Sequence, residues 1–139
     1  MEESDRRQPH ILVIDDNPGD TQLLRMALEN AGVNCQLTEL DNGRDALDFI
    51  GRCGRFADAP APDLVVLDLN LPRNDGLEIL EALRASENFP EVPVAILSSS
   101  SSTRDRSKVL ALQVKRFIVK PPDLDAYMKI GATLAELLG

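Results

Sequence analysis

Three carboxylates stand where short apolar runs of the chain end, and together they could hold a metal ion. Asp15 and Asp16 end one apolar run, and Asp68 ends another. Carboxylates brought together repel one another and raise each other's pKa unless a cation neutralises them. A hard divalent ion does this, and Mg²⁺ suits a few carboxylates combined with waters and a phosphate. The three residues predict a magnesium site, provided that the fold brings them together.

Two further polar residues follow apolar runs of the same kind. Ser98 comes after residues 94–97, and Lys120 comes after residues 117–119. A hydroxyl and an ammonium group beside a divalent ion complete a pocket for a tetrahedral dianion. The five residues therefore indicate a Mg²⁺-dependent phosphoryl site with a carboxylate available as the nucleophile.

The apolar runs alternate with segments of helical periodicity, which is typical of a parallel α/β sheet. The runs are apolar enough for strands without a solvent-exposed face. Right-handed crossovers then place helices on both faces of the sheet, and ligands bind beyond the carboxyl ends of its strands. This predicts one doubly wound α/β domain with five strands. The expected strands are 11–14, 33–38 (at an edge), 64–68, 94–97 and 117–119, and the expected helices are 18–31, 43–50, about 76–83, 103–112 and about 123–138.

The composition bounds the size of the protein and excludes one large class of partner. A chain of 139 residues fits one domain with a proper core, and 43% hydrophobic residues is ordinary for a globular protein. The net charge of −8 argues against a domain that binds nucleic acid through its phosphate backbone. No apolar run approaches the roughly 18 residues of a membrane span, and the N-terminus lacks a secretory signal. We expect a cytoplasmic protein with a flexible leader at residues 1–9 and the domain at residues 10–139.

Motifs that do not occur in the sequence exclude several other chemistries. Cys35 and Cys53 match no CxxC spacing, which argues against structural zinc and thioredoxin-like redox activity. His10 is the only histidine, so a histidine-rich metal site is excluded. Neither a dinucleotide-binding GxGxxG loop nor a P-loop is present. Carboxylates are therefore the expected agents of any chemistry.

The ordered set of strand-end residues resembles a response-regulator receiver domain. The resemblance extends from about residue 10 to residue 138, and it implies a flavodoxin-like fold with strand order 2-1-3-4-5. In finer detail the chain looks most like single-domain regulators partnered with bacterial phytochrome histidine kinases. The general resemblance is carried by Asp15-Asp16, Leu67-Asp68-Leu69-Asn70-Leu71-Pro72, Asp75-Gly76, Ser98 and Lys120-Pro121, and the finer one by Asp16-Asn17-Pro18-Gly19-Asp20, residues 55–60 and residues 68–72.

The resemblance implies a role for each acidic residue. Asp68 matches the residue that accepts a phosphoryl group from a histidine of a sensor kinase. Asp16 and Asp68 match direct ligands of Mg²⁺, and the backbone carbonyl of Asn70 matches a third. Asp15 matches a carboxylate that usually acts on the metal through water.

The resemblance also implies a conformational switch. Lys120 matches the lysine that pairs with the phosphoryl oxygens, and Pro121 matches a proline that commonly follows a cis peptide bond. Ser98 matches the hydroxyl that moves toward the acyl phosphate, and Phe117 matches an aromatic residue whose rotation follows that movement. Two plainer interpretations stay open: Ser98 as part of a serine-rich loop, and Phe117 as an ordinary half-buried aromatic residue.

Two other functions compete with a phosphorelay receiver that at most dephosphorylates itself slowly. A small Mg²⁺-dependent phosphohydrolase of the haloacid-dehalogenase type would also use an aspartyl phosphate. Enzymes of that type have an Asp-x-Asp motif at the nucleophile, in which the second Asp acts as acid and base. Asn70 occupies the place of that second Asp here, and an amide cannot shuttle protons. A binding-only pseudo-receiver would be expected to lack an acidic residue or the lysine, whereas Asp15, Asp16, Asp68 and Lys120 are all present.

A group of basic residues near the C-terminal third suggests an output surface. It spans the fourth helix and the fifth strand of an otherwise acidic chain, and with the fifth helix it is a candidate homodimer surface. A solvated helix face explains the same charges equally well. The residues are Arg104, Arg106, Lys108, Lys115 and Arg116.

Overall fold

Five parallel strands form one sheet in the order β2-β1-β3-β4-β5, which confirms the predicted doubly wound fold. The computed structural model describes residues 8–69, 71, 76–98 and 103–138, with residues 103–105 described by their backbone only. Each strand is parallel to its neighbours, so the carboxyl ends of all five strands lie at one edge of the sheet. The strands are β1 (His10–Ile14), β2 (Gln36–Leu40), β3 (Leu64–Leu67), β4 (Val94–Ser98) and β5 (Arg116–Val119).

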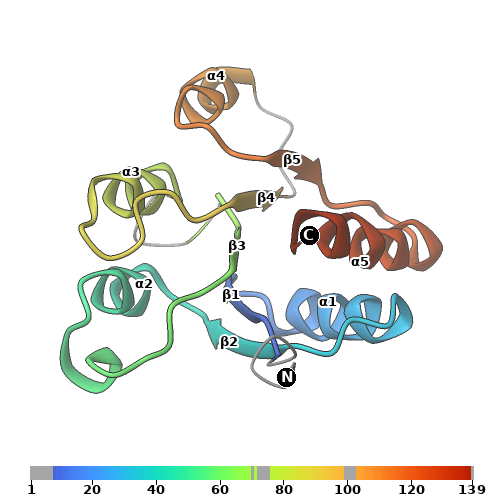
Figure 1. The fold of residues 1–139 in the computed structure, drawn as a ribbon. Helices are drawn as coiled ribbons and strands as arrows, with labels where there is room; N and C mark the ends of the chain where they lie inside the picture. Colours follow the sequence, from blue (N-terminus) through green and yellow to red (C-terminus); the bar gives the residue numbers. More distant parts are fainter. Residues whose placement is uncertain (1–7, 70, 72–75, 99–102, 139) are drawn as a thin grey trace.

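Helices cover both faces of this sheet. Figure 1 shows α1 and α5 on one face, and α2, α3 and α4 on the other. No helix among the described residues is both long and apolar enough to cross a membrane. The helices are α1 (Pro18–Asn30), α2 (Gly43–Ile50), α3 (Gly76–Ala85), α4 (Thr103–Ala111) and α5 (Leu124–Leu138), and a short 3-10 helix, η2 (Gly54–Phe56), follows α2.

The three central strands are buried on both faces because their side chains alternate between two apolar clusters. Leu12 and Ile14 of β1 pack in the cluster under α2 and α3, whereas Ile11 and Val13 pack under α1 and α5. Both edge strands are partly exposed, and Val119 of β5 is 41% accessible. The expectation that the strands have no solvent-exposed face is therefore right for β1, β3 and β4 and wrong for β5.

Strand β2 begins three residues later than the sequence pattern predicts. Its pairing with β1 starts where Gln36 lies opposite His10, and the Gln36 amide donates to the Pro9 carbonyl. The preceding residues end α1 instead: Gly32 adopts a φ of +77°, and the Val33 amide donates to the Leu28 carbonyl. The alternation of apolar residues from Val33 onward thus includes residues that end α1, and for this reason the strand is predicted to start too early.

Helices α1 and α5 pack closely, and this contact fixes the elements that flank the strand ends. A Cβ atom added to Gly131 of α5 would lie 2.0 Å from the carbonyl oxygen of Ala27 in α1, so only glycine allows this approach. The buried face of α5 consists of Tyr127, Ile130, Gly131 and Leu134. Leu124 is apolar, but it does not belong to this face, since it is 53% exposed at the start of the helix.

Candidate functional site

The strand ends bring the predicted acidic residues together. Asp15 follows β1 and Asp68 follows β3, and these neighbouring strands pair Ile14 with Leu67. The Asp68 amide donates to the Ile14 carbonyl at 2.9 Å, so the acceptor candidate is held by the backbone of the adjacent strand. Lys120 follows the edge strand β5 in the same way, and its amide donates to the Ser98 carbonyl at 2.8 Å.

Three carboxylates form a cluster that suits a divalent cation. One oxygen from each of Asp15, Asp16 and Asp68 can be chosen so that all lie within 4.8 Å of one another. Asp15 and Asp68 are buried, while Asp16 is exposed and leaves the cluster open to solvent. Hard oxygen donors in this number are what Mg²⁺ or a similar divalent ion takes from a protein. The predicted grouping of these three residues is present in the structure, whereas Asn70 lies outside the described residues.

The turn after β1 is built by local hydrogen bonds that the sequence motif supplies. The Asn17 amide donates to Asp15 Oδ1 at 2.9 Å. The Asn17 side chain in turn caps α1 by accepting from the Gly19 and Asp20 amides, and Pro18 occupies the first helical position. The same few residues thus orient a carboxylate toward the strand ends and start the helix that flanks them.

Lys120 contacts three carboxylates at once, and one of them is not among the predicted site residues. Its ammonium group donates to Asp20 Oδ2 at 2.7 Å, Asp15 Oδ2 at 2.9 Å and Asp68 Oδ2 at 3.2 Å. The Lys120 side chain is only 9% exposed. Asp20 lies three residues after the helix cap Asn17, in the first turn of α1, where a negative charge is favourable. This position is enough to explain why the residue is acidic. Nothing in the sequence pattern indicates that it reaches a lysine one hundred residues away.

Burial and charge act in opposite directions at this site. Burial raises the pKa of Asp15 above its usual range, and the hydrogen bond from Lys120 only partly offsets this effect. Burial alone would lower the pKa of Lys120, but hydrogen bonds to Asp20 and Asp15 and the charge of Asp68 outweigh it, so the pKa lies above its ordinary value. Lys120 therefore stays a cation over the whole physiological pH range.

A hollow adjoins the acidic cluster on the side of α2. It has a volume of about 510 Å³, and Asp15 and Asp16 are among the residues that line it. Arg55, which pairs with Asp45 at 2.8 Å, contributes a positive charge to the lining. The carboxylate cluster is thus reachable from solvent by a small ligand.

The predicted switch residues lie on β4 and β5, which follow β3 in the sheet. Ser98 ends β4 and is completely buried, and Phe117 on β5 lies opposite Ile96 and is half-buried. The guanidinium of Arg106 lies 4.8 Å from the centroid of the Phe117 ring. The expectation of a cis bond before Pro121 is wrong, because no peptide bond among the described residues is cis. A trans bond is the ordinary state of an X–Pro peptide, favoured by about 0.5–1 kcal/mol.

Comparison with known proteins decides the family. Residues 11–130 match the response regulator receiver domain. The chain belongs to the response regulator receiver family. Proteins of this kind act in signalling, and the predicted receiver fold and phosphorelay function are those of the family.

Several individual receivers are similar over most of their length. Response regulator Rcp1 from Synechocystis sp. is 30% identical over 120 residues, covering 86% of this chain and 82% of the relative. The crystal structure of the phosphorylated cyanobacterial phytochrome response regulator RcpA has a TM-score of 0.87 at 30% identity, with 94% of both chains covered. The Mn²⁺-bound form of Rcp1 has a TM-score of 0.84 at 27% identity, with 92% of both chains covered.

Proposed function

We propose that this receiver accepts a phosphoryl group on Asp68 from a histidine of a sensor kinase. The observation that carries the proposal is the position of Asp68. Its carboxylate is buried, lies beside two further carboxylates and has the Lys120 ammonium 3.2 Å from Oδ2. A nucleophilic oxygen, a cation-binding cluster and a fixed ammonium group thus meet at one point, as phosphoryl transfer requires.

In the proposed step, one carboxylate oxygen of Asp68 attacks the phosphorus atom of a phosphohistidine. The P–O bond to Asp68 forms as the P–N bond breaks, and the imidazole nitrogen leaves with the electron pair of that bond. Lys120 already donates to Asp68, and its ammonium group can donate to the phosphoryl oxygens once it shifts toward them. Its raised pKa keeps it charged for this purpose. Hydrolysis of the acyl phosphate by water is expected to be slow, so the chain is a signalling protein with at most slow self-dephosphorylation.

The proposed cofactor is Mg²⁺, held by Asp15, Asp16 and Asp68. The donor set fits because it offers carboxylate oxygens only, within 4.8 Å of one another. The resemblance adds the Asn70 carbonyl as a ligand and assigns a water-mediated contact to Asp15. When bound, the ion neutralises negative charge on the reacting oxygens. The existence of a Mn²⁺-bound Rcp1 structure supports a divalent ion at this site.

The proposed output is a rearrangement of Ser98 and Phe117. The Ser98 backbone already binds the Lys120 amide, and Phe117 is half-buried one strand away. A new dianion on Asp68 would attract the Ser98 hydroxyl, and the space that it leaves would admit the Phe117 ring. The contact between Phe117 and Arg106 would then carry the change to α4.

The proposed partners are a phytochrome-type kinase and a second copy of the chain. The kinase type is supported by the similarity to RcpA, which is described as a phytochrome response regulator.

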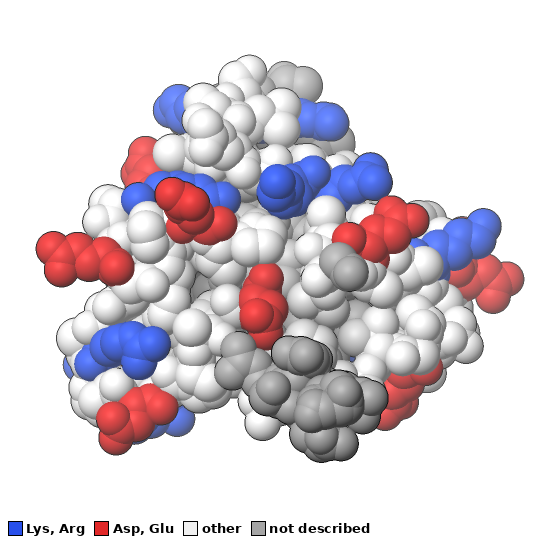
Figure 2. All heavy atoms as spheres, viewed as in Figure 1, with Lys and Arg blue, Asp and Glu red and all other residues white. Residues whose placement is uncertain are grey.

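Figure 2 shows Lys and Arg side chains gathered over α4 and β5, and Arg106, Lys108, Lys115 and Arg116 are exposed there. A homodimer through α4, β5 and α5 would use these charges, and Arg116→Glu combined with Lys108→Glu should then change the sedimentation behaviour. Four further expectations stay predictions: a leader at residues 1–9, a domain at residues 10–139, a cytoplasmic location, and the lack of binding to nucleic acid or membranes.

A phosphotransfer assay tests the proposal. A sensor kinase is autophosphorylated with labelled ATP, freed of nucleotide and mixed with the receiver in the presence of Mg²⁺. We expect label to move to the wild type and to the Asp58→Asn control, which changes an exposed aspartate, but not to Asp68→Asn. Equal labelling of Asp68→Asn would contradict the proposal. Faster transfer from a phytochrome-type kinase than from kinases of other types would support the proposed partner.

A further inference from the structure

The Lys120 ammonium has all three of its N–H groups engaged by carboxylates. An ammonium group carries three donors and no acceptor, and Lys120 donates to Asp15, Asp20 and Asp68. A phosphoryl group on Asp68 also needs at least one of these donors. One existing hydrogen bond must therefore weaken or break when the phosphoryl group arrives.

Asp20 differs from the other two partners of Lys120 because it has no other task at the site. Asp15 and Asp68 belong to the carboxylate cluster that fits a divalent ion, whereas Asp20 does not. Asp20 nevertheless makes the shortest of the three contacts, at 2.7 Å. Its bond to Lys120 is the one that phosphoryl transfer does not use.

Two hydrogen bonds hold the main chain of Asp20 in place. The Asp20 amide donates to Asn17 Oδ1 in the first turn of α1, and its carbonyl accepts from the Tyr127 hydroxyl at 3.3 Å. Tyr127 is 2% exposed and comes from α5, which packs tightly on α1. The main chain of Asp20 is thus fixed between two packed helices, and we do not expect it to follow the Lys120 ammonium when that group moves.

The negative charge of the site also opposes the arrival of a phosphoryl group. Among the described residues that form the cluster or bind Lys120, Asp15, Asp16, Asp20 and Asp68 carry four negative charges against the one positive charge of Lys120, so a divalent ion would still leave an excess of one negative charge among them. The Asp20 side chain is 23% exposed, which screens its charge only in part. A dianionic phosphodonor therefore meets more repulsion than the metal cluster and Lys120 alone would cause.

We propose that Asp20 is a positioning residue that restrains phosphorylation by holding Lys120 in its resting place in competition with the incoming phosphoryl group. The inference rests on the proposed function, because it concerns the phosphoryl group on Asp68. Asp20 raises the donor concentration needed to phosphorylate the receiver. It thereby favours a protein-bound donor, which adds binding energy through its own contacts, over free anionic donors.

The test is an Asp20→Asn variant, which keeps the shape of the side chain and removes its charge. At saturating Mg²⁺ the variant and the wild type are titrated with beryllofluoride, an analogue of the phosphoryl group, and binding is followed by amide resonances. We expect binding that is about three- to tenfold tighter in the variant. With acetyl phosphate as donor, KM should fall by a similar factor while the maximal rate changes by less than about twofold.

Two matched variants separate this effect from simpler ones. Asp41→Asn removes the same charge from an exposed residue that lines the same hollow and is not one of the three partners of Lys120. It should leave KM close to the wild-type value. Asp20→Glu keeps a carboxylate and should restore most of the wild-type restraint. Melting temperatures measured alongside show whether each variant is folded.

Three outcomes would overturn the inference. Weaker or unchanged beryllofluoride binding in Asp20→Asn would show that Asp20 assists Lys120 or does not affect it. An equal gain in beryllofluoride affinity in Asp41→Asn would show that the effect comes only from long-range charge and not from the contact with Lys120. Failure of the wild type to bind beryllofluoride or to be phosphorylated would overturn the proposed function as well, whereas the first two outcomes leave that function intact.

Discussion

Arg106 of α4 stacks its guanidinium on the ring of Phe117 of β5, 4.8 Å from the ring centroid. The contact joins a helix on one face of the sheet to the residue that we propose as the moving part of the switch. Cation–π contacts of exposed residues are worth about 0.5–1 kcal/mol, which is enough to bias a ring between two orientations. Movement of Phe117 and movement of α4 should therefore be coupled.

The first prediction concerns this contact. Replacing Arg106 with Ala should lower the free energy of unfolding by about 0.5–1 kcal/mol and shift the ring resonances of Phe117. Lys108→Ala on the same helix removes an exposed charge that is not stacked on this ring, and it serves as the control. Identical ring resonances in Arg106→Ala and the wild type would show that the contact does not hold Phe117.

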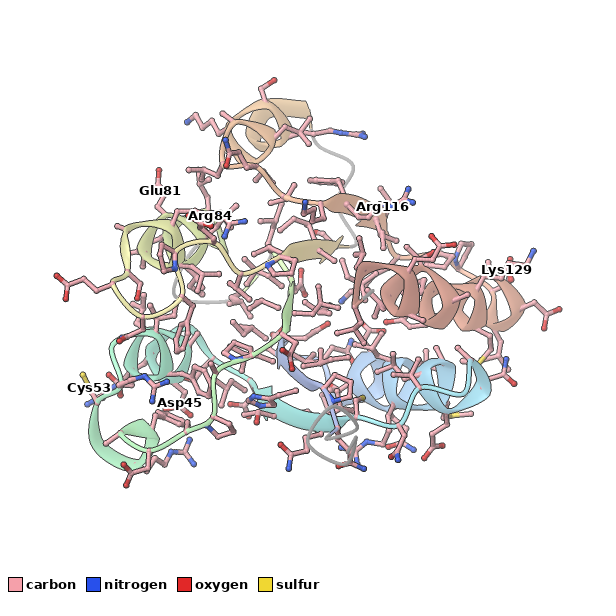
Figure 3. All side chains as sticks on the ribbon, in the orientation of Figure 1. Asp45, Cys53, Glu81, Arg84, Arg116 and Lys129 are labelled. Atoms are coloured by element: carbon pink, nitrogen blue, oxygen red, sulfur yellow. The ribbon has the colours of Figure 1, made fainter. Side chains whose placement is uncertain are left out.

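The second prediction concerns Arg84 of α3, which binds the ends of two loops. Its guanidinium donates to the carbonyls of Val92 at 2.7 Å and Leu112 at 2.9 Å, and also to those of Pro90 and Gln113. Figure 3 shows Arg84 at the inner side of α3. Arg84→Met should cost about 2–3 kcal/mol, because part-buried carbonyls lose charge-assisted hydrogen bonds.

Chemical denaturation measures this cost, and Arg44→Met provides the comparison. Arg44 is exposed on α2, so its replacement should change the free energy of unfolding by no more than about 0.5 kcal/mol. A loss in Arg84→Met as small as that in Arg44→Met would mean that the loops do not depend on the guanidinium.

The third prediction concerns the two cysteines and pH. Burial raises the pKa of the Cys35 thiol above its ordinary value of 9.0, whereas Cys53 is exposed, at the outer edge of the molecule in Figure 3. Because only the thiolate reacts, Cys35 should be alkylated much more slowly than Cys53 at pH 8, and its rate should still rise with pH above 9.0.

The same shift sets the sign of a stability effect. A thiol whose pKa is higher in the folded state keeps its proton there. Its contribution to the free energy of unfolding is therefore constant below the unfolded pKa, and stability falls as pH rises through the raised value.

Alkylation rates measured on Cys53→Ser and Cys35→Ser variants separate the two sites. Equal rates at pH 8 would contradict the burial of Cys35.

The fourth prediction concerns metal binding. Mg²⁺ at about ten times its Kd should stabilise the folded wild type by about 1.4 kcal/mol, since the cluster exists only in the folded state. The melting temperature should rise by several degrees, and EDTA should reverse the rise. Asp16→Asn should abolish most of it, while Asp41→Asn should keep it, because Asp41 is not in the cluster. An equal rise in Asp16→Asn would place the ion elsewhere.

The sequence predicts the central part of the site because that part depends on strand ends. Asp15, Asp68 and Lys120 each follow an apolar run, and parallel strands bring such positions to one edge whatever the details of packing. The buried central strands are predicted well for the same reason, since continuous apolar runs identify them directly.

Features that depend on tertiary contacts escape sequence analysis. Asp20 joins the site only because Lys120 extends toward α1, and no local pattern encodes that contact. The start of β2 is set by the pairing of Gln36 with His10 rather than by alternation within the segment. Leu124 is apolar and in helical phase, yet it lies beyond the packed part of α5 and remains exposed.

The central claim is that Asp68 is the phosphoryl acceptor, and intact-mass analysis tests it most directly. The wild type, Asp68→Asn and the exposed-residue control Asp58→Asn are incubated with a small-molecule phosphodonor, with and without Mg²⁺. We predict one Mg²⁺-dependent phosphoryl group, labile to hydroxylamine, on the wild type and the control and none on Asp68→Asn. The same adduct on Asp68→Asn, or none on the wild type with either a small donor or a phosphorylated kinase, would contradict the claim.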